Sequence, residues 1–335
     1  MRILIIKTSA LGDIVHALPT LTALRRAMPE ATLGWVVEDV FRPLLDGHPD
    51  LDFVLPVRTR AWRRISPFRS VPEILAFVRS LQAFGPDIAL DLMGNHKAGV
   101  IAALSLADRR IGIQSSSRRE TSSSLWMNES VPATGQHAVE RNLAMLEGLG
   151  IKARVPDFSP ERLLRQPSPA LDLPADFVLI HPGAGWGNKR YPPPSWGEVA
   201  NAVSSRLQLQ VLIASGPGEE ELAEEVARHS EGTARPVLLP TIPTLGEALR
   251  RARLVMAGDT GPMHLAHALG TPTLAVMGPT NPLRHGPYAA VDQAIVHRLP
   301  CSFCYRRFKE VKACLLEISP DLVTERAVQL LQSSA

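Results

Sequence analysis

The residue types best suited to chemistry gather in one turn, at Asp259, Thr260 and Gly261. The apolar run LVMA precedes this turn and predicts a strand, while Pro262 suits the first turn of a helix. Asp and Thr cap helices, and glycine lets a ligand approach the backbone. The start of a helix binds anions, because its N–H groups and its dipole point outwards. The turn therefore predicts either a phosphate site or an ordinary capped crossover.

A second candidate is Asp13, in the loop after the first apolar run. Gly12 is the one glycine of this loop, so the G-x-G-x-x-G spacing of a dinucleotide site is missing, although Glu38 ends the next expected strand where a ribose-binding acid would lie. The missing glycine spacing weighs against a nicotinamide oxidoreductase. We expect Asp13 at the N-cap of a helix, either as a cap alone or as a general base that takes a proton from an attacking hydroxyl.

Strands and helices must position these residues, and the sequence alternates the two from its start. Apolar runs of strand length are followed by segments of helical periodicity through the first half. Five prolines between Pro156 and Pro174 predict a linker, after which the same alternation restarts. We expect an α/β fold of two parallel-sheet domains facing a central cleft, with ligands at the carboxyl ends of the strands.

Composition narrows the class of protein. A chain of 335 residues with 45% hydrophobic residues can bury two cores. A net charge of +3 gives no reason to expect nucleic acid as a partner. Three cysteines suit a reducing cytoplasm, and the run Ile3–Ile6 is too short for the core of a signal peptide. No window approaches a membrane span, so we expect a soluble protein.

Five blocks of sequence carry a resemblance to a known family. In order they are KTSALGDIVHALP, WVVEDVF, QHAVERN, HPGAGWGNKRYPPPSW and GDTGPMHLAHALGTPTLAVMGPTNP. Together they resemble glycosyltransferase family 9, the ADP-heptose:lipopolysaccharide heptosyltransferases. The resemblance implies a GT-B fold with an acceptor-binding Rossmann-like domain at 1–160, a nucleotide-sugar-binding Rossmann-like domain at 161–318, and a C-terminal helix at 319–335 packing back towards the first domain. It also implies an inverting transferase that uses no metal and no other cofactor.

The resemblance implies a role for each matching residue. Asp13 matches the general base of the family. Lys189 would neutralise the departing diphosphate and Glu219 would bind the ribose. The full set of implied donor-binding residues is Lys189, Glu219, Asp259, Thr260, Gly261 and His264. From the residues alone, a solvated loop lysine and a buried core histidine stay open as alternatives for Lys189 and His264.

Basic residues in the first half suit an acidic acceptor. Four arginines lie within seven positions with no acid among them: Arg58, Arg60, Arg63 and Arg64. The resemblance implies that the phosphates and carboxylates of lipid A and Kdo (3-deoxy-D-manno-octulosonic acid) contact Arg60, Arg63, Lys97 and Arg119. Arginine suits this task because it pairs with such anions through two hydrogen bonds. A solvated basic surface is the alternative.

The implied activity is transfer of heptose from ADP-L-glycero-D-manno-heptose to the Kdo and inner-core region of lipopolysaccharide. The implied place is the cytoplasm, in peripheral contact with the inner membrane, where lipid A is held. WVVEDVF and RTRAWRR are more similar to the first heptosyltransferase and HPGAGWG to the second, which leaves the acceptor open. A non-catalytic sugar-nucleotide sensor would keep the donor residues but would have no use for Asp13.

The three cysteines form a separate question. Cys301, Cys304 and Cys314, with His297 upstream, could supply four zinc ligands, yet their spacing fits no standard finger. His264 and His267 lie on one face of the expected helix without an evident third ligand. We therefore expect no metal site.

Overall fold

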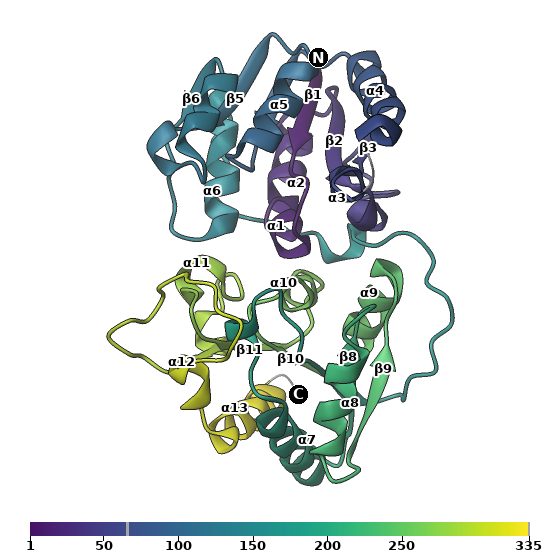
Figure 1. Ribbon diagram of the computed structural model, residues 1–335, viewed down its shortest axis with the longest axis vertical. Helices are drawn as coiled ribbons and strands as arrows, with labels where there is room; N and C mark the ends of the chain where they lie inside the picture. Colours follow the sequence, from purple (N-terminus) through teal and green to yellow (C-terminus); the bar gives the residue numbers. More distant parts are fainter. Residues whose placement is uncertain (65–66, 334–335) are drawn as a thin grey trace. The chain divides into compact units, whose positions relative to one another are not determined.

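The computed structural model describes residues 1–64 and 67–333. The chain divides into two compact units, Met1–Gln166 and Pro167–Ala335 (Figure 1). Each unit is a parallel sheet flanked by helices, so each is described by itself. Within the described residues, both sheets have six strands.

The first sheet has the strand order β3-β2-β1-β4-β5-β6, and every neighbouring pair is parallel. Its central strand buries Ile3, Leu4, Ile5 and Ile6 completely, and successive side chains point to opposite faces, so both faces of the sheet are covered. The strands are β1 (Arg2–Ile6), β2 (Thr32–Glu38), β3 (Phe53–Val57), β4 (Ile88–Asp91), β5 (Arg109–Ile113) and β6 (Glu129–Val131).

Helices of the first unit connect the strands and pack on the sheet. Phe77 and Leu81 of α4 and Ile101 of α5 share one core with the sheet residues Leu4 and Ile6. The helices α2 and α6 pack against each other. The α-helices are α1 (Leu11–Val15), α2 (Leu18–Ala27), α3 (Thr59–Trp62), α4 (Pro67–Phe84), α5 (His96–Leu104) and α6 (Ala138–Ala144).

The second sheet has the order β12-β11-β10-β7-β8-β9, again with parallel neighbours. Its core gathers the aromatic side chains Tyr191 and Trp196 with the aliphatic residues of the strands. The strands are β7 (Phe177–His181), β8 (Gln210–Ser215), β9 (Ala234–Leu238), β10 (Leu254–Ala257), β11 (Thr273–Met277) and β12 (Ala294–Val296). The α-helices are α7 (Pro193–Leu207), α8 (Glu220–Arg228), α9 (Ile242–Arg251), α10 (Gly261–Ala268), α11 (Pro282–His285), α12 (Ala313–Leu316) and α13 (Pro320–Ser333).

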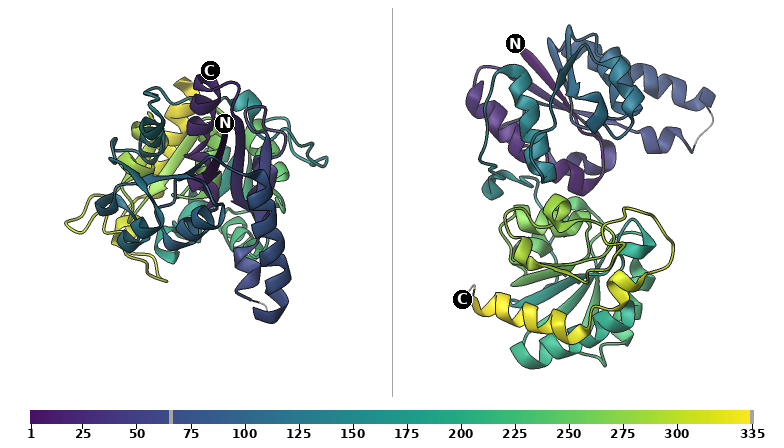
Figure 2. Two further views of the ribbon diagram at one scale, coloured as in Figure 1. Left: turned by 90° about the horizontal axis from the view of Figure 1, so that it is seen from above. Right: turned by 90° about the vertical axis from the view of Figure 1, so that its left-hand side faces the viewer.

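The C-terminal helix α13, yellow in Figure 2, packs beside α7. Its residues Val323, Ala327 and Leu331 recur at helical spacing and are buried in the core of the second unit. The expectation that this helix packs back towards the first domain stays a prediction. Among the described residues, no helix combines the length and the apolar character that crossing a bilayer requires.

Both sheets reverse their strand order at one place. In the first unit the reversal falls between β1 and β4, and in the second between β7 and β10. Loops that leave the carboxyl ends of two such strands run to opposite sides and open a crevice, where doubly wound sheets bind ligands. The loops after β1 and β4, and those after β7 and β10, are therefore where a site is expected in each unit.

Candidate functional site

Asp13 follows β1 at the reversal point of the first sheet. The helix α1 begins at Leu11 with Ala10 as its N-cap, so Asp13 is the third helical residue. Its Oδ2 accepts a hydrogen bond of 3.0 Å from the backbone N of Ala10. The expectation of Asp13 at the N-cap is therefore wrong, because a carboxylate at the third position reaches back to the N-cap N–H instead. The half-buried side chain is held in place by one backbone contact.

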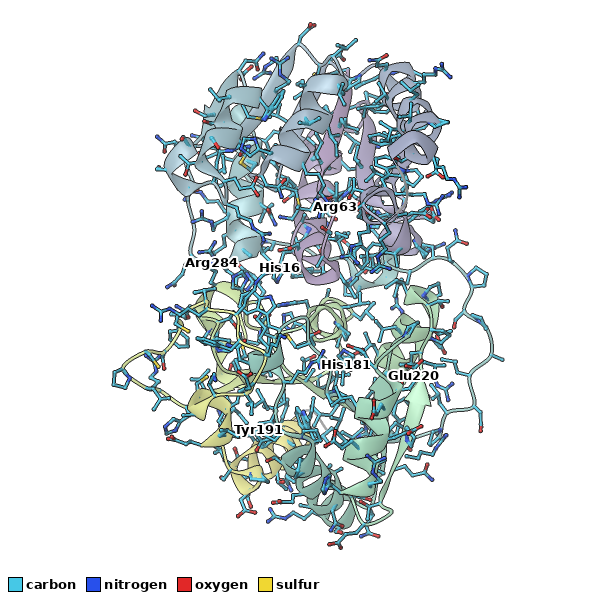
Figure 3. The ribbon with its side chains drawn as sticks, in the orientation of Figure 1. His16, Arg63, His181, Tyr191, Glu220 and Arg284 are labelled. Atoms are coloured by element: carbon cyan, nitrogen blue, oxygen red, sulfur yellow. The ribbon has the colours of Figure 1, made fainter. Side chains whose placement is uncertain are left out.

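The predicted acceptor residues Arg60, Arg63 and Lys97 come close enough for their charges to interact. Burial lowers the pKa of Lys97, the neighbouring Glu38 carboxylate opposes this, and the two arginines lower it further. Lys97 Nζ lies 3.4 Å from Glu38 Oε1, and Thr59 Oγ1 donates to the same oxygen. Glu38, which ends β2, is thus the anionic partner of Lys97, a role that the sequence did not indicate. Arg63 is labelled in Figure 3.

Arg119 is exposed and lies in the loop after β5, close to the turn that follows β4. A Cβ on Gly94 of that turn would lie 3.5 Å from the backbone N of Arg119. The preceding residue, Arg118, makes a fully buried ion pair with Asp91 at the end of β4. Since Asp91 also accepts hydrogen bonds from the backbone N–H groups of Met93 and Gly94, it fixes both loops. Arg119 is thereby placed at the carboxyl edge of the first sheet.

Asp259 follows β10 and is the centre of the donor-side cluster. Its Oδ2 lies 2.6 Å from Lys189 Nζ and accepts a 2.6 Å hydrogen bond from Thr280 Oγ1, while Oδ1 lies 3.3 Å from His264 Nε2. Burial by itself raises the pKa of Asp259, but His264 and Lys189 outweigh it and hold the pKa well below its usual value. Asp259 is therefore a buried carboxylate that positions a lysine and a histidine beside the start of α10.

Thr260 is the N-cap of α10, and Gly261 and Pro262 are its first two residues. The side chain of Thr260 makes no capping hydrogen bond. The backbone N–H groups of this first turn are thus not capped by that side chain, and together with Lys189 they form a positive corner suited to a diphosphate. Tight packing keeps the corner in shape: a Cβ on Gly258 would lie 2.7 Å from the carbonyl oxygen of Lys189.

The Lys189 loop is braced by residues that the sequence did not single out. Lys189 Nζ lies 4.3 Å from the centroid of the Trp186 ring, and Arg307 Cζ lies 4.6 Å from it. Asn188, which is buried, donates 2.9 Å to the carbonyl oxygen of Arg306 and accepts from the backbone N of Phe308. The expected alternative of a solvated lysine does not hold, because the Lys189 side chain is 14% exposed and ion-paired.

Glu219 lies at the N-cap of α8, after β8, and its carboxylate lies over the loop that follows β7. A Cβ on Gly183 would lie 2.3 Å from Glu219 Oε1, so a larger residue there would displace the carboxylate from its present position. His181, the last residue of β7, has Nε2 3.9 Å from Glu219 Oε2. Burial lowers the pKa of His181, against the opposing charge of Glu219. Figure 3 labels His181 at the end of its strand and Glu220, where α8 begins.

The cysteines and histidines do not combine into a cluster. Cys301 and Cys304 are exposed and Cys314 is buried. His264 contacts Asp259, whereas His267 Nε2 lies 2.9 Å from the carbonyl oxygen of Tyr288. In the described part of the chain, no three His, Cys, Asp or Glu side chains are arranged to hold a metal ion. That the reaction needs no metal stays a prediction.

Comparisons with known proteins cover almost the whole chain. The family model of glycosyltransferase family 9 (heptosyltransferase) matches residues 74–314. Lipopolysaccharide heptosyltransferase 1 of Pseudomonas aeruginosa is 32% identical, covering 92% of this chain and 87% of its own length. The enzyme of the same name from Escherichia coli K12 is also 32% identical, over 86% of this chain and 91% of its own.

Solved structures with a similar fold also belong to heptosyltransferases. The E. coli heptosyltransferase WaaC with ADP matches all of both chains with a TM-score of 0.79 and 27% identity. E. coli ADP-heptose lps heptosyltransferase II, at 21% identity and a TM-score of 0.74, shares the fold. The predicted α/β class with two Rossmann-like sheets of GT-B type is confirmed. This chain therefore belongs to glycosyltransferase family 9, the heptosyltransferases, and is a glycosyltransferase.

Proposed function

We propose that this protein transfers heptose from ADP-L-glycero-D-manno-heptose to the Kdo region of the lipopolysaccharide inner core, with inversion at the anomeric carbon and with Asp13 as general base. The observation that carries the proposal is the positive corner of the second unit, where Lys189 lies 2.6 Å from Asp259 beside the start of α10. A nucleoside diphosphate fits this corner, and a relative of the same fold was solved with ADP-2-deoxy-2-fluoro heptose. Glu219 then binds the ribose hydroxyls.

The acceptor is an anionic glycolipid in this proposal. Arg60, Arg63, Lys97 and Arg119 present positive charge at one edge of the first sheet, and Lys97 is paired with Glu38 before a ligand is bound. The relatives at about a third identity are named lipopolysaccharide heptosyltransferase 1, which favours a Kdo acceptor over an already heptosylated one. Because such an acceptor carries lipid A, the enzyme acts in peripheral contact with the cytoplasmic face of the inner membrane.

The proposed chemistry is a single displacement. Asp13 takes the proton of the acceptor hydroxyl as its oxygen attacks the anomeric carbon. The bond between that carbon and the diphosphate oxygen breaks, and its electron pair leaves with ADP. Lys189 and the N–H groups at the start of α10 stabilise the charge that develops on the diphosphate, so the reaction needs no metal ion. Attack opposite the leaving group inverts the configuration.

The test is turnover of ADP-heptose with Kdo-lipid A and, in parallel, with a heptosylated acceptor. We expect turnover with Kdo-lipid A, and transfer to the heptosylated acceptor alone would assign the enzyme to the second type instead. In Asp13→Asn the amide oxygen can still accept from Ala10 N, so the fold is retained while the base is lost. Turnover should fall by about 10² to 10⁴ with an unchanged melting curve.

A measurement of ADP affinity is the control for this test. ADP affinity, measured by calorimetry, should be the same in Asp13→Asn as in the unmodified protein, because the proposed donor residues all belong to the second unit. If a stably folded Asp13→Asn protein turned over normally, Asp13 would be a structural residue of α1 and the reaction would need another base.

A further inference from the structure

A long loop, residues 297–312, joins β12 to α12, and Figure 1 shows it leading into α12. Connections of this length inside a compact domain are uncommon and usually carry a function. Its exposed basic residues are Arg298, Arg306, Arg307, Lys309 and Lys312, against one acid, Glu310. The loop therefore brings an excess of positive charge to the second unit, which favours an anionic ligand.

Tyr305 fixes the loop beside the Asp259 cluster. The backbone N of Tyr305 donates 3.1 Å to the carbonyl oxygen of Pro279, and the backbone N of Asn281 donates 3.3 Å to Tyr305 Oη. Pro279 and Asn281 flank Thr280, whose hydroxyl donates to Asp259 Oδ2. Tyr305 thus ties the loop to the segment that completes this cluster.

Asn188 fixes the next residues of the loop beside Lys189. Its backbone N donates 3.2 Å to the carbonyl oxygen of Phe308, and its Oδ1 accepts 3.3 Å from the backbone N of the same residue. Its Nδ2 donates 2.9 Å to the carbonyl oxygen of Arg306. Because Asn188 is buried and directly precedes Lys189, these bonds hold the two segments together. Arg307 lies between the two bonded residues, so its backbone is held next to the Lys189 loop.

The side chain of Arg307 lies on the same aromatic ring that Lys189 contacts. Arg307 Cζ is 4.6 Å and Lys189 Nζ is 4.3 Å from the centroid of the Trp186 ring. An indole face attracts cations at this distance, so the ring can hold an exposed guanidinium in one place. Within residues 1–64 and 67–333, no carboxylate pairs with Arg307. The charge of Arg307 is therefore available to a ligand.

The donor cluster needs more positive charge than Lys189 supplies. Lys189 is ion-paired with Asp259 at 2.6 Å, so part of its charge is already balanced. A nucleoside diphosphate carries several negative charges, and it carries more after it has left the sugar than before. Arginine suits such a group, because its planar fork pairs with phosphate oxygens through two hydrogen bonds.

We propose that Arg307 is a second donor-binding cation: stacked on Trp186 beside Lys189, its guanidinium binds the diphosphate of the nucleotide sugar and stabilises the charge that develops on the departing ADP. This deepens the proposed function and rests on it, because the ligand is the donor of that reaction. Trp186 is then a positioning residue, which acts through the cations that it holds.

The test is calorimetry with ADP as the probe. In Arg307→Gln the affinity for ADP should fall about tenfold, because charged hydrogen bonds to phosphate are lost. Arg307→Lys keeps the charge without the fork and should recover part of the affinity. Both variants should melt like the unmodified protein, since the side chain is exposed. Equal ADP affinities in Arg307→Gln and the unmodified protein overturn the proposal.

The matched control is Arg298→Gln, which makes the same change in the same loop. Arg298 is exposed and is also stacked, with Cζ 5.7 Å from the centroid of the Phe303 ring, but that ring is not the one that Lys189 contacts. Arg298→Gln should bind ADP like the unmodified protein. An equal fall in affinity in both variants would mean that general attraction acts instead of a site at Arg307, and would overturn the proposal.

A double-mutant cycle tests the part played by Trp186. Trp186→Phe keeps an aromatic face and should retain most of the ADP affinity, whereas Trp186→Leu should weaken binding. In the Trp186→Leu background, Arg307→Gln should lower the affinity much less than it does alone, because the guanidinium is no longer held at the site. Full additivity of the two substitutions would overturn Trp186 as the residue that positions Arg307.

These binding measurements separate the inference from the proposed function, because they involve neither the acceptor nor Asp13. A protein that bound ADP through Arg307 but transferred no heptose would support the Arg307 site and contradict the proposed function. Intact heptose transfer with equal ADP affinities in Arg307→Gln and the unmodified protein would keep the function and overturn the Arg307 site. Absence of ADP binding by the unmodified protein would overturn both.

Discussion

Asp259 and Glu219 are both acidic residues of the donor side, and their surroundings give them different tasks. Asp259 is buried and contacts Lys189, Thr280 and His264, so it holds these side chains in place. The Glu219 side chain is 31% exposed, and one of its oxygens lies over Gly183. It can therefore accept hydrogen bonds from a ribose without first losing a partner ion.

We predict that Glu219→Gln weakens ADP binding about 10- to 100-fold, because hydrogen bonds to a charged group are worth about 1.5–3 kcal/mol. The measurement is calorimetry with ADP alone, together with a melting curve, which should be unchanged. Glu220→Gln is the matched control: it is an exposed carboxylate one residue away, at the start of α8, and should leave the affinity as it is. Equal affinities in Glu219→Gln and the control would mean that the ribose is not bound beside the end of β8.

A substitution of Lys189 tests the same site less directly, because it has two effects. Replacement of Lys189 by a neutral residue would remove the proposed phosphate contact and would also leave the Asp259 carboxylate buried without its ammonium partner. Breaking a buried pair from one side destabilises a protein by about 3–5 kcal/mol. We therefore expect Lys189→Ala to lower the melting temperature as well as the affinity for ADP.

At the scale of elements, α3 and α5 carry three of the proposed acceptor-binding cations. Arg60 and Arg63 lie on or just after α3, while Lys97 lies in the first turn of α5. We predict that replacing Arg60 and Arg63 together by Ala raises the KM for Kdo-lipid A at least about tenfold and leaves ADP affinity unchanged. Added salt should reduce the difference between the variant and the unmodified protein, because exposed charges are screened beyond about 8 Å at physiological ionic strength.

The control for this prediction keeps the change in net charge the same. Arg69 and Arg79 are exposed arginines of α4, so replacing both by Ala removes two positive charges from the same unit. That variant should retain the KM of the unmodified protein. An equal rise in KM for both pairs would mean that general attraction, and not a site on α3, draws in the acceptor.

Most of the regular elements could be predicted because their signals are local. Buried strands appear in the sequence as short apolar runs such as ILII and LVMA. Helices such as α8 and α9 appear as apolar residues at helical spacing, because one face of the helix is buried. The strands β6 and β12 could not be predicted, since each has three residues at the edge of a sheet and shows no periodicity. The QHAVERN block was noted as a motif, but its helix α6 was not.

The candidate site could be predicted only in part. The residue types that suggest chemistry were visible in the sequence, but their partners were not, because the partners come from distant segments. Thr280 contacts Asp259, and Glu38 pairs with Lys97, only once the strands are ordered in the sheets. Even Asp13, two residues from the start of its helix, was placed at the cap, since the sequence does not reveal that Ala10 takes that position.

At the scale of the whole molecule, the buried imidazole of His48 predicts a loss of stability in acid. Burial lowers the pKa of this imidazole to about 4, and its Nδ1 accepts a hydrogen bond from the backbone N of Asp50. Between about pH 6.5 and 4 the unfolded chain therefore binds more protons than the native one. The contribution of the neutral His48 to the free energy of unfolding is complete above this pH window. It is lost as the pH falls through the window, and the loss is at most about 3 kcal/mol.

We predict that His48→Asn flattens this dependence, because the amide oxygen can accept from Asp50 N without titrating. Melting temperatures at neutral pH and near the acid end of the window should differ less in the variant than in the unmodified protein. His229→Asn is the control, since that imidazole is exposed, and should melt with the original pH dependence. If His48→Asn lost as much stability in acid as the unmodified protein, the loss would come from another group. One such group is His285, whose pKa is also lowered by burial to about 4.

The division of labour between the two sheets bears on how such enzymes diversify. The proposed acceptor cations belong to the first unit and the proposed diphosphate corner to the second, and each set is supported by its own core. Substitutions in sites that share no partners change free energies almost additively. After a gene duplication, selection can therefore remodel the loops around Arg60 and Arg119 towards a new acceptor while the inherited donor half is kept unaltered.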